Sequence, residues 1–405
     1  MNKPNILYIS YDGMLEPLGQ SQVIAYLERL IDMGKIRILS FEKPVDKADT
    51  DRLYALRRRL DDAGIAWHPL TYHKSPTVPA TLFDLAWGTV VALWLTLRHG
   101  VRLVHARSYP PALIGRVVKL ILGPKLLFDM RGLWADERTD GGLWPPGGRL
   151  YRVVKRVEKI LLLGADHIVT LTGASRSVIE GFSYLRDRSH APLSVIPTCA
   201  DLERFRPGLR SAPEVFTVGY LGSLGTWYMF DQVLIAFKEI RERLPEARLL
   251  VINRNEHAFI REKLAEHNIK ASLCTIRATD HTNAPEAIAE MSVGTAIIKP
   301  VYSKIASAPT KLAEYLGCGI PCLGNAGVGD MEEILEGQRV GVALEGFSPK
   351  EIAEGVDRLL SLFNDPGLAE RCRETAVRNF SLESGVAQYR AIYRDLLNGA
   401  VQVER

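Results

Sequence analysis

The sequence predicts an α/β protein built from two consecutive doubly wound parallel sheets, each Rossmann-like. Strand-like apolar runs alternate with helical patterns along nearly the whole chain, and parallel strands require such crossover helices. The alternation is interrupted by a polar stretch at residues 204–213 and then restarts, so this stretch is the expected interdomain linker. A length of 405 residues also favours two domains over one.

The N-terminal domain is expected to span residues 1–205. Short apolar runs indicate its strands, and longer runs with helical periodicity indicate its helices. The expected strands cover residues 5–10, 36–40, 103–106, 125–129 and 167–171, and the expected helices cover residues 19–33, 50–63, 80–98, 110–121, 149–163 and 174–182. Ligands of such sheets bind beyond the carboxyl ends of the strands.

The C-terminal domain is expected to span residues 206–379 and to repeat the same pattern. Its expected strands cover residues 215–221, 248–252, 273–276, 294–298 and 321–323. The closing segment, 380–405, carries apolar side chains at helical spacing up to about residue 397, which predicts a final helix.

Composition limits the classes of function. A hydrophobic content of 47% with 24% charged residues is that of an ordinary globular protein. The net charge of +4 and a pI near 8.7 are too mildly basic for a nucleic-acid-binding surface, so no nucleic acid partner is expected. This balance suits an anionic small molecule or contact with acidic lipid.

Cysteine usage and the first residues favour a cytoplasmic protein. The five cysteines form no zinc-binding spacing, and their odd number predicts reduced thiols. The first residues enter a strand at once, so no signal peptide is expected. Asp49-Thr-Asp51 is an Asp-x-Asp triple, but it opens a helix, where acids favour the dipole. We therefore expect no metal ion.

Two segments raise the hypothesis of membrane contact. Residues 85–97 form a run of thirteen uncharged residues, which is too short to span a bilayer. This run is either a buried helix or an interfacial helix anchored by Trp87 and Trp94. The expected helix at 149–163 places five cations opposite an apolar face. That charged face is either solvated or in contact with the inner face of an anionic membrane.

The most informative segment is residues 303–324, which read SKIASAPTKLAEYLGCGIPCLG. An apolar strand and a loop precede a short helix that opens at Pro309-Thr310, with proline at the first helical position. Free N–H groups at this helix start, beside Lys304 and Lys311, predict a phosphate or diphosphate site. Glu314 lies one turn from Thr310 on the same face, where a carboxylate can accept hydrogen bonds from sugar hydroxyls. The segment therefore predicts a nucleotide-sugar site.

Residues 309–321 resemble the donor-binding signature of retaining glycosyltransferase family 4, which has the GT-B fold. The segments 11–22, 218–225 and 380–383 resemble other parts of that family in the same order. The resemblance implies transfer of a sugar from a nucleotide diphosphate sugar to a hydroxyl acceptor with retention of configuration, without metal or cofactor. It also implies a cleft between the domains and a final helix that returns to the N-terminal domain. A weaker resemblance is to members that assemble bacterial surface polysaccharides, with a glycan or lipid-linked glycan as acceptor.

Two positions depart from the family pattern. Ala306 stands where the first of two acidic residues is usual, which affects contact with the sugar. The loop Gly222-Ser-Leu-Gly-Thr-Trp-Tyr-Met lacks the arginine and lysine that usually reach the diphosphate. Lys304, Lys299 and Arg254 are the alternatives for the missing charge.

These considerations give the following expected site residues. Expected donor-binding residues are Gly19, Gly222, Ser223, Arg254, Ser307, Pro309, Thr310, Lys311 and Glu314. Expected acceptor-binding residues are Asp12, Arg107, Asp129, Arg131, Trp134 and Asp136. Expected catalytic residues are Arg131, Glu314 and Lys304.

Other functions remain as alternatives. A nucleotide-sugar epimerase would use the same fold without an acceptor, and a catalytically degenerate scaffold would bind nucleotide sugars only. An NAD-dependent enzyme is disfavoured because the Gly-x-Gly-x-x-Gly pattern is absent: Gly219, Gly222 and Gly225 have the wrong spacing.

Overall fold

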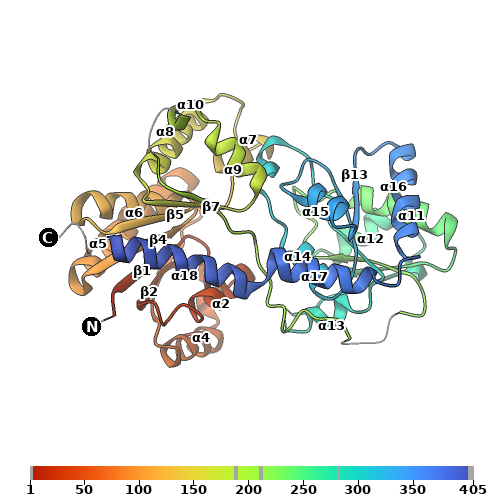
Figure 1. Cartoon of the computed structure of the whole chain (residues 1–405), viewed down its shortest axis with the longest axis horizontal. Helices are drawn as coiled ribbons and strands as arrows, with labels where there is room; N and C mark the ends of the chain where they lie inside the picture. The colour runs from red at the N-terminus through yellow and green to blue at the C-terminus, as the bar shows by residue number, and fades with distance from the viewer. Residues whose placement is uncertain (1–2, 187–189, 209–212, 281, 400–405) are drawn as a thin grey trace. The chain divides into compact units, whose positions relative to one another are not determined.

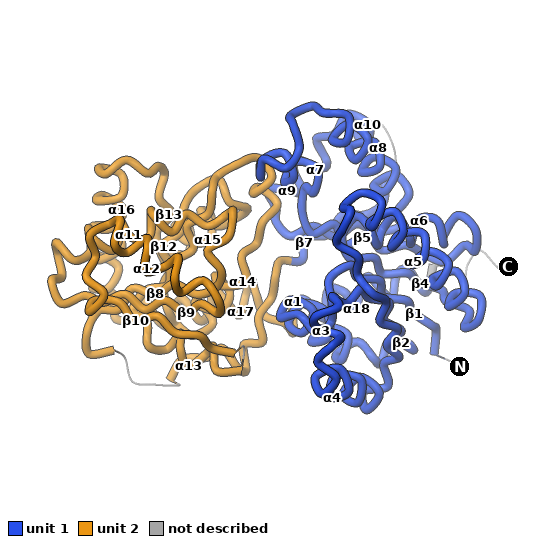
Figure 2. The backbone as a smooth tube through the Cα atoms, turned by 180° about the vertical axis from the view of Figure 1, so that it is seen from behind, with its two compact units in different colours: residues 1–196, 385–405 blue, residues 197–384 orange. Residues whose placement is uncertain are grey.

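The computed structural model describes residues 3–186, 190–208, 213–280 and 282–399. The chain forms two compact units, each with its own parallel sheet (Figure 2). Unit 1 comprises residues 1–196 and 385–405, and unit 2 comprises residues 197–384. The predicted fold class, two doubly wound Rossmann-like halves, is confirmed.

Unit 1 contains a seven-stranded parallel sheet in the order β3-β2-β1-β4-β5-β6-β7 (Figure 1). Its strands are β1 (Asn5–Ser10), β2 (Lys35–Glu42), β3 (Ala66–Thr71), β4 (Val101–Arg107), β5 (Lys125–Asp129), β6 (His167–Thr170) and β7 (Leu193–Val195). The strand order reverses between β1 and β4, and such a point is where doubly wound sheets bind ligands.

The helices of unit 1 follow the alternation expected from the sequence. They are α1 (Pro17–Gly19), α2 (Ala25–Leu27), α3 (Pro44–Ala48), α4 (Thr50–Asp62), α5 (Thr77–His99), α6 (Tyr109–Leu122), α7 (Trp134–Asp140), α8 (Arg149–Gly164), α9 (Gly173–Glu180), α10 (Ser183–Arg186) and α18 (Leu382–Gly399). The single helix predicted at 19–33 is wrong in detail, because a π-helical turn at Gln20–Ile24 separates α1 from α2. Such turns are frequent at functional sites.

Helices cover both faces of the unit 1 sheet. Gly115 of α6 faces Val104 and Ala106 of β4. His105 points the other way, as alternation along a strand requires, and its ring lies 5.2 Å from that of Tyr389 in α18. The layer of α5, α6 and α8 therefore covers the face opposite to α18. Arg390 of α18 also bonds to Asp32 at 3.1 Å, which ties this final helix to unit 1.

Unit 2 contains a six-stranded parallel sheet in the order β10-β9-β8-β11-β12-β13. Its strands are β8 (Thr217–Leu221), β9 (Arg248–Ile252), β10 (Cys274–Arg277), β11 (Val293–Thr295), β12 (Cys322–Asn325) and β13 (Gly341–Leu344). Its α-helices are α11 (Phe230–Arg243), α12 (His257–Glu266), α13 (Ala284–Ile288), α14 (Thr310–Gly317), α15 (Met331–Gly337), α16 (Pro349–Leu362) and α17 (Leu368–Phe380), with short 3-10 turns at Ala271–Leu273 and Tyr302–Ala306.

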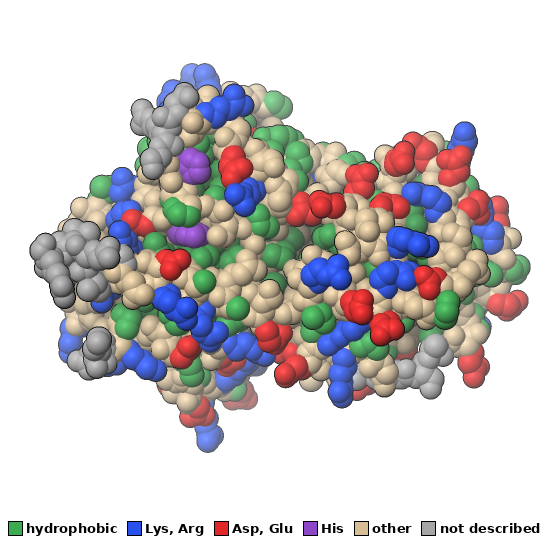
Figure 3. Space-filling model, in the orientation of Figure 1, with side chains coloured by type: hydrophobic (Ala, Val, Ile, Leu, Met, Phe, Trp, Pro, Cys, Tyr) green, Lys and Arg blue, Asp and Glu red, His purple; other side chains and the backbone are tan. Residues whose placement is uncertain are grey.

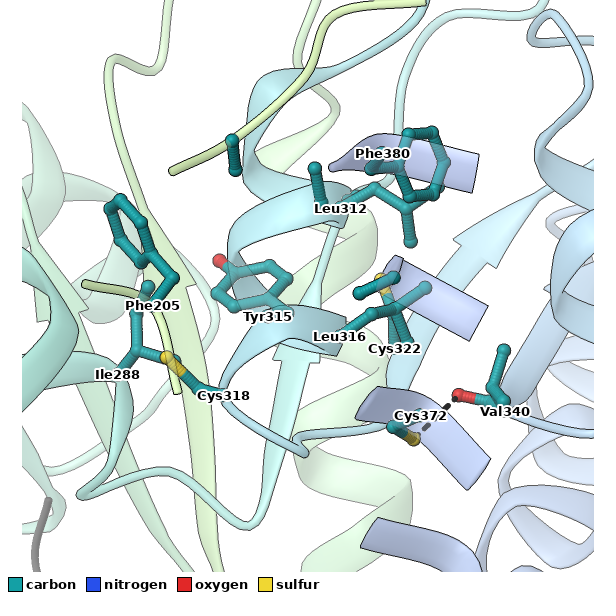
Figure 4. Close-up of a cluster of buried hydrophobic side chains, with 14 of the residues drawn as sticks. Phe205, Ile288, Leu312, Tyr315, Leu316, Cys318, Cys322, Val340, Cys372 and Phe380 are labelled. Atoms are coloured by element: carbon teal, nitrogen blue, oxygen red, sulfur yellow. Dashed lines mark hydrogen bonds between the residues drawn. The ribbon is translucent and has the colours of Figure 1, made fainter. Parts of the chain in front are cut away.

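Helix α14 lies inside the core of unit 2. Figure 4 shows its residues Leu312, Tyr315 and Leu316 among side chains that come from several other segments. Phe205 precedes the sheet in sequence, and Phe380 ends α17. Since Lys311 through Cys318 are all buried, the position of α14 is fixed along its whole length.

The boundary between the two units lies earlier in the chain than expected, at residues 196–197 instead of 205–206. Residues 197–205, expected in the N-terminal domain, belong to unit 2, because Leu202 and Phe205 are buried in the core around α14. Of the expected linker at 204–213, residues 209–212 lie outside the described part of the chain.

Helix α5 is longer than the apolar run that signalled it. With 23 residues it is long and apolar enough to cross a membrane by length and composition, whereas the run of thirteen uncharged residues inside it is too short to do so. One face of α5 packs in unit 1, where Gly88 lies against Phe41 and Ile114. A third of its most apolar window is buried in this way.

Candidate functional site

In unit 2 the strand order reverses between β8 and β11, so the loops after these two strands meet at one edge of the sheet. Gly222 follows β8 with φ of +110°, a conformation that favours glycine. The chain after β11 leads through the turn Tyr302–Ala306 into α14. The sequence-predicted donor segment therefore lies where doubly wound sheets bind ligands.

The start of α14 is one residue later than expected. Pro309 is the N-cap rather than the first helical residue, and no side chain caps the helix. The first turn contains no acid but does contain Lys311, which the helix dipole disfavours unless an anion lies there. Lys311 and Glu314 are only 6% and 7% exposed. Two ionisable groups are thus buried in the first two turns of one short helix.

Lys311 is enclosed by aromatic rings. Its Nζ lies 4.5 Å from the ring centre of Tyr220 and 3.8 Å from that of Tyr228. This buried Nζ has no hydrogen-bond partner among the described residues. The loop that follows β8, residues 222–229, is called the glycine loop. A Cβ at Gly222 would lie 3.6 Å from Lys311 Nζ, so the ammonium group lies directly beneath this loop. Burial lowers the pKa of Lys311 to about 7, against the opposing charges of Cys322 and Glu314.

Lys304 occupies a similar environment. Its Nζ lies 3.8 Å from the ring centre of Trp227, and the residue is 6% exposed. Main-chain bonds hold Trp227 in place, since its carbonyl accepts from the N–H of Lys299 at 2.9 Å. The loop that lacks the family's arginine and lysine thus supplies aromatic rings that hold two lysines from elsewhere in unit 2. Lys299 and Arg254, the other two alternatives for the missing charge, are exposed.

Glu314 is buried near two positive charges, those of Lys311 and Arg204. Burial raises its pKa to about 7, although the charges of Lys311 and Arg204 oppose this shift. Lys311 and Glu314 can therefore exist as a charged pair or a neutral pair near neutral pH, and an anionic ligand would favour the protonated lysine. Ala306, which stands in place of the family's first acid, is buried.

The glycine loop is held from two sides. The N–H of Leu221 donates to the hydroxyl of Tyr315 at 2.9 Å, and Tyr315 fills the space beside Gly294, where a Cβ would lie 2.4 Å from its ring. On the other side, Asn253 donates to the carbonyl of Gly222 at 3.0 Å. These contacts fix the loop relative to α14, so a ligand between them would meet a preformed site.

In unit 1 four of the expected acceptor residues gather at the carboxyl ends of β1, β4 and β5. Arg107 Nε lies 3.4 Å from Asp12 Oδ2, and its Nη1 lies 3.6 Å from Asp129 Oδ2. Arg131 Nη1 lies 3.8 Å from Asp129 Oδ1. Burial alone would raise the pKa of Asp129, but Arg131, His105 and Arg107 outweigh it and keep that pKa below its usual value.

Strained backbone marks the same edge of unit 1. Arg131 has φ of +61°, and the N–H of Gly132 donates to the carbonyl of Met130 at 2.8 Å across it. Ser108, directly after β4, has φ of +72°. Such conformations cost about 1–3 kcal/mol in non-glycine residues and cluster at functional sites. They support a ligand role for this edge.

Other predicted residues are occupied by structural contacts. Both carboxylate oxygens of Asp136 are used, by Tyr151 at 2.8 Å and Lys155 at 3.0 Å. Trp134 packs against the rings of Tyr109 and Trp144. The space beside Gly19 is filled by the carbonyl of Gly13, 2.2 Å from where a Cβ would lie. These contacts account for the three residues without a ligand, and their roles in binding stay predictions.

Several residues of the site were not found by sequence reasoning. Tyr220, Trp227 and Tyr228 hold the two lysines, and Tyr315 sets the glycine loop. The adjacent aromatics at 227–228, in the loop where cations were expected, were the available signal. Among the described residues, no group of three or more His, Cys, Asp or Glu side chains could hold a metal ion. Asp49 instead caps α4 by accepting from the N–H of Arg52.

Comparison with known families agrees with this geometry. Residues 201–378 match the family described as "Glycosyl transferases group 1", and residues 36–195 match the "Glycosyl transferase 4-like domain". The chain belongs to glycosyltransferase family 4. A curated relative of this glycosyltransferase is N-acetyl-alpha-D-glucosaminyl L-malate synthase of Bacillus anthracis, 33% identical over 90 residues. That match covers 21% of the chain and only 23% of the relative's length.

Solved structures show that this glycosyltransferase has the GT-B fold. Sucrose-phosphate synthase from Thermosynechococcus elongatus matches with TM-score 0.76 and 15% identity, over 98% of this chain and 100% of that one. Anabaena HepE in complex with UDP and glucose matches with TM-score 0.65 and 14% identity, over 96% and 98% of the respective chains. At these identities the likeness concerns the fold alone.

Proposed function

We propose that this chain transfers a sugar from a nucleotide diphosphate sugar to a hydroxyl acceptor, with retention of anomeric configuration. The observation that carries the proposal is the buried ammonium of Lys311, beneath the Gly222 loop and at the first turn of α14. A buried cation without a hydrogen-bond partner is costly, and a diphosphate would supply both the charge and the acceptor atoms.

The two lysines support a specific division of roles. Lys304 and Lys311, with the N–H groups at the start of α14, would bind the diphosphate and stabilise the charge that grows on it as the sugar leaves. Glu314 would accept hydrogen bonds from the sugar. Gly222, Ser223, Ser307, Pro309 and Thr310 belong to the same proposed donor site. No cofactor is needed for this chemistry, and we propose that it proceeds without a metal ion.

The acceptor would bind in unit 1. Asp12, Arg107, Asp129 and Arg131 lie at the carboxyl edge of its sheet and offer both acceptors and donors for hydroxyl groups. We propose a glycan or lipid-linked glycan as acceptor, in the assembly of a surface polysaccharide or glycoconjugate. In a retaining same-face substitution, the departing diphosphate would remove the proton of the incoming hydroxyl, and Arg131 would stabilise the developing charge.

The first experiment is to identify the donor. Thermal shifts with UDP, GDP, ADP, CMP and dTDP rank the nucleotides, because a ligand of the native state stabilises it by an amount that grows with the ratio of ligand concentration to dissociation constant. HepE binds UDP, so UDP is the first candidate. Incubation with the matching nucleotide sugars should then give slow release of nucleoside diphosphate, unchanged in EDTA. Loss of activity in EDTA, restored by manganese, would contradict the metal-free mechanism.

The product distinguishes the alternatives. Transfer with retention leaves the anomeric configuration of the donor in the new linkage, which NMR of the product reads directly. An epimerase would interconvert free nucleotide sugars without any acceptor. A scaffold would bind the nucleotide sugar and release no nucleoside diphosphate.

A further inference from the structure

Helix α5 carries a continuous apolar stripe on its exposed face. Its large apolar side chains at spacings of mostly three or four residues are 50–70% exposed: Val78, Leu82, Phe83, Trp87, Val90, Trp94 and Leu97. The only charged side chain between residues 77 and 97 is Asp84, which is buried and bonded to His73 and Tyr11. At 1.5 Å per residue the helix is about 34 Å long, so the stripe is large for a protein surface exposed to water.

The neighbouring helices continue this surface. Helix α6 packs against α5, and α8 packs against α6, all on the sheet face opposite to α18. Leu120 and Ile121 of α6 are 68% and 60% exposed. On α8 the exposed face mixes cations with Leu150, Val153, Ile160 and Leu163. The expected apolar face of α8 included Leu150 and Val153, and this expectation is wrong for both, since they are 39% and 50% exposed. Thirteen of the 22 large hydrophobic side chains exposed in the described chain lie on these three helices.

The exposed charge on this layer of helices is positive. Helices α5, α6 and α8 contain eight Lys and Arg and two acids, a net charge of +6 against +4 for the whole chain. Both acids, Asp84 and Glu158, are buried. The cations include the exposed Arg149, Arg152 and Arg156. By contrast, the face seen in Figure 3, over α18, shows positive and negative side chains side by side.

We propose that the outer surface of α5, α6 and α8 docks on an anionic lipid bilayer. The stripe of α5 would enter the interface with Trp87 and Trp94 among the headgroups, and the cations of α8 would meet anionic lipid. A second copy of the chain fits less well, because a symmetric contact would bring two layers of charge +6 together. The inference does not depend on the proposed transfer reaction, since docking needs neither donor nor acceptor.

Vesicle flotation of the full chain tests the proposal. The chain should float with vesicles of phosphatidylcholine and phosphatidylglycerol in 0.1 M salt, and much less with pure phosphatidylcholine or in 0.5 M salt. Variant V90E/W94E should weaken binding to the anionic vesicles at least tenfold, and so should R149Q/R152Q/R156Q. F259E is the matched control: Phe259 is 45% exposed on α12 of unit 2, and this variant should bind like the wild type.

Several results would overturn the proposal. They are failure of the wild type to bind anionic vesicles, equal binding by V90E/W94E, and binding that is insensitive to lipid charge. Analytical ultracentrifugation without lipid decides the remaining case. A wild-type dimer that V90E/W94E converts to a monomer, with vesicle binding unchanged, would make the surface a contact between copies of the chain. Circular dichroism and the thermal midpoint show that each variant is folded.

Discussion

The Nζ atom of Lys311 lies 3.8 Å from the ring centre of Tyr228, in a glycosyltransferase whose glycine loop carries no cation of its own. A second ring, that of Tyr220, lies on the same ammonium at 4.5 Å. Cation–π contacts of a desolvated ammonium are worth about 2 kcal/mol, which offsets only part of the cost of burying a charge. The remaining cost is the reason to expect an anionic ligand at this ammonium group.

Replacement of Lys311 by methionine should stabilise the free protein and weaken donor binding. The folded-state pKa of Lys311 lies below its unfolded value of 10.5, so the protonated lysine disfavours folding more as the pH falls from 10.5 towards about 7. The gain in thermal midpoint should therefore be larger at pH 7 than at pH 10. The dissociation constant for the nucleotide should rise at least tenfold, about 1.4 kcal/mol. Lys350→Met, at a side chain 84% exposed, should change neither quantity.

Donor binding should take up protons above neutral pH. With the pKa of Lys311 near 7, part of the free protein carries a neutral amine, and a bound diphosphate would favour the ammonium. Affinity for a nucleotide sugar should then fall as the pH rises from 7 to 9. Calorimetry in buffers of different ionisation enthalpy measures the proton uptake, which should disappear in Lys311→Met. A pH-independent affinity would show that Lys311 does not contact the diphosphate.

Glu314→Gln should lower turnover without unfolding the protein. The amide has the shape of the carboxyl group but cannot accept as strongly from sugar hydroxyls, so kcat/KM should fall roughly a hundredfold or more, about 2.7 kcal/mol. The raised pKa of Glu314 makes wild-type stability fall as the pH rises from about 4.5 to 7, and the variant should lose this dependence. Glu262→Gln, at an exposed acid of α12, is the control. Full activity in Glu314→Gln would remove this residue from the donor site.

Asp129→Asn should destabilise unit 1. The variant leaves Arg107 and Arg131 without the buried charge that faces them, and loss of one partner from a buried ion pair costs about 3–5 kcal/mol. Because the pKa of Asp129 is lowered in the folded state, its contribution is present above pH 4 and is lost as the pH falls further. Denaturant unfolding at pH 7 and pH 3 checks both statements. Asp12→Asn, whose side chain is 52% exposed, should cost less than about 1 kcal/mol.

The sequence predicted the interior strands well and the edge strands poorly. The expected strands do not include β3, β7 and β13, and all three lie at sheet edges, whereas the fourth edge strand, β10, was expected at 273–276. Pro69 interrupts the apolar pattern of β3, and an edge position tolerates proline because one side of the strand has no hydrogen-bonded neighbour. The interior strands are buried on both faces and show as continuous apolar runs.

Local signals found the donor helix but could not find what surrounds it. Pro309 and Thr310 mark the start of α14 within one residue, because helix starts depend on neighbouring residues. The rings around Lys311 come from Tyr220 and Tyr228, more than eighty residues earlier, and only the sheet order brings them there. The contacts of Asp136 with Tyr151 and Lys155 were not foreseen for a related reason. Its face of α7 turns towards α8, which the sequence of α7 alone does not reveal.

Arg373 of α17 donates to three carbonyl groups: those of Leu202, Phe205 and Gly317. A recombinant fragment of unit 2 that started at residue 206 would lose two of these acceptors. It would thereby lose the hydrogen bonds that join residues 202–205, through Arg373, to the C-terminal end of α14. Such a truncation would leave the guanidinium of Arg373 with Gly317 as the remaining one of these three acceptors. It would also leave a cavity where the side chains of Leu202 and Phe205 pack. A fragment made for crystallisation or labelling should therefore begin at Pro197, so that residues 197–205 remain part of the unit whose core they complete.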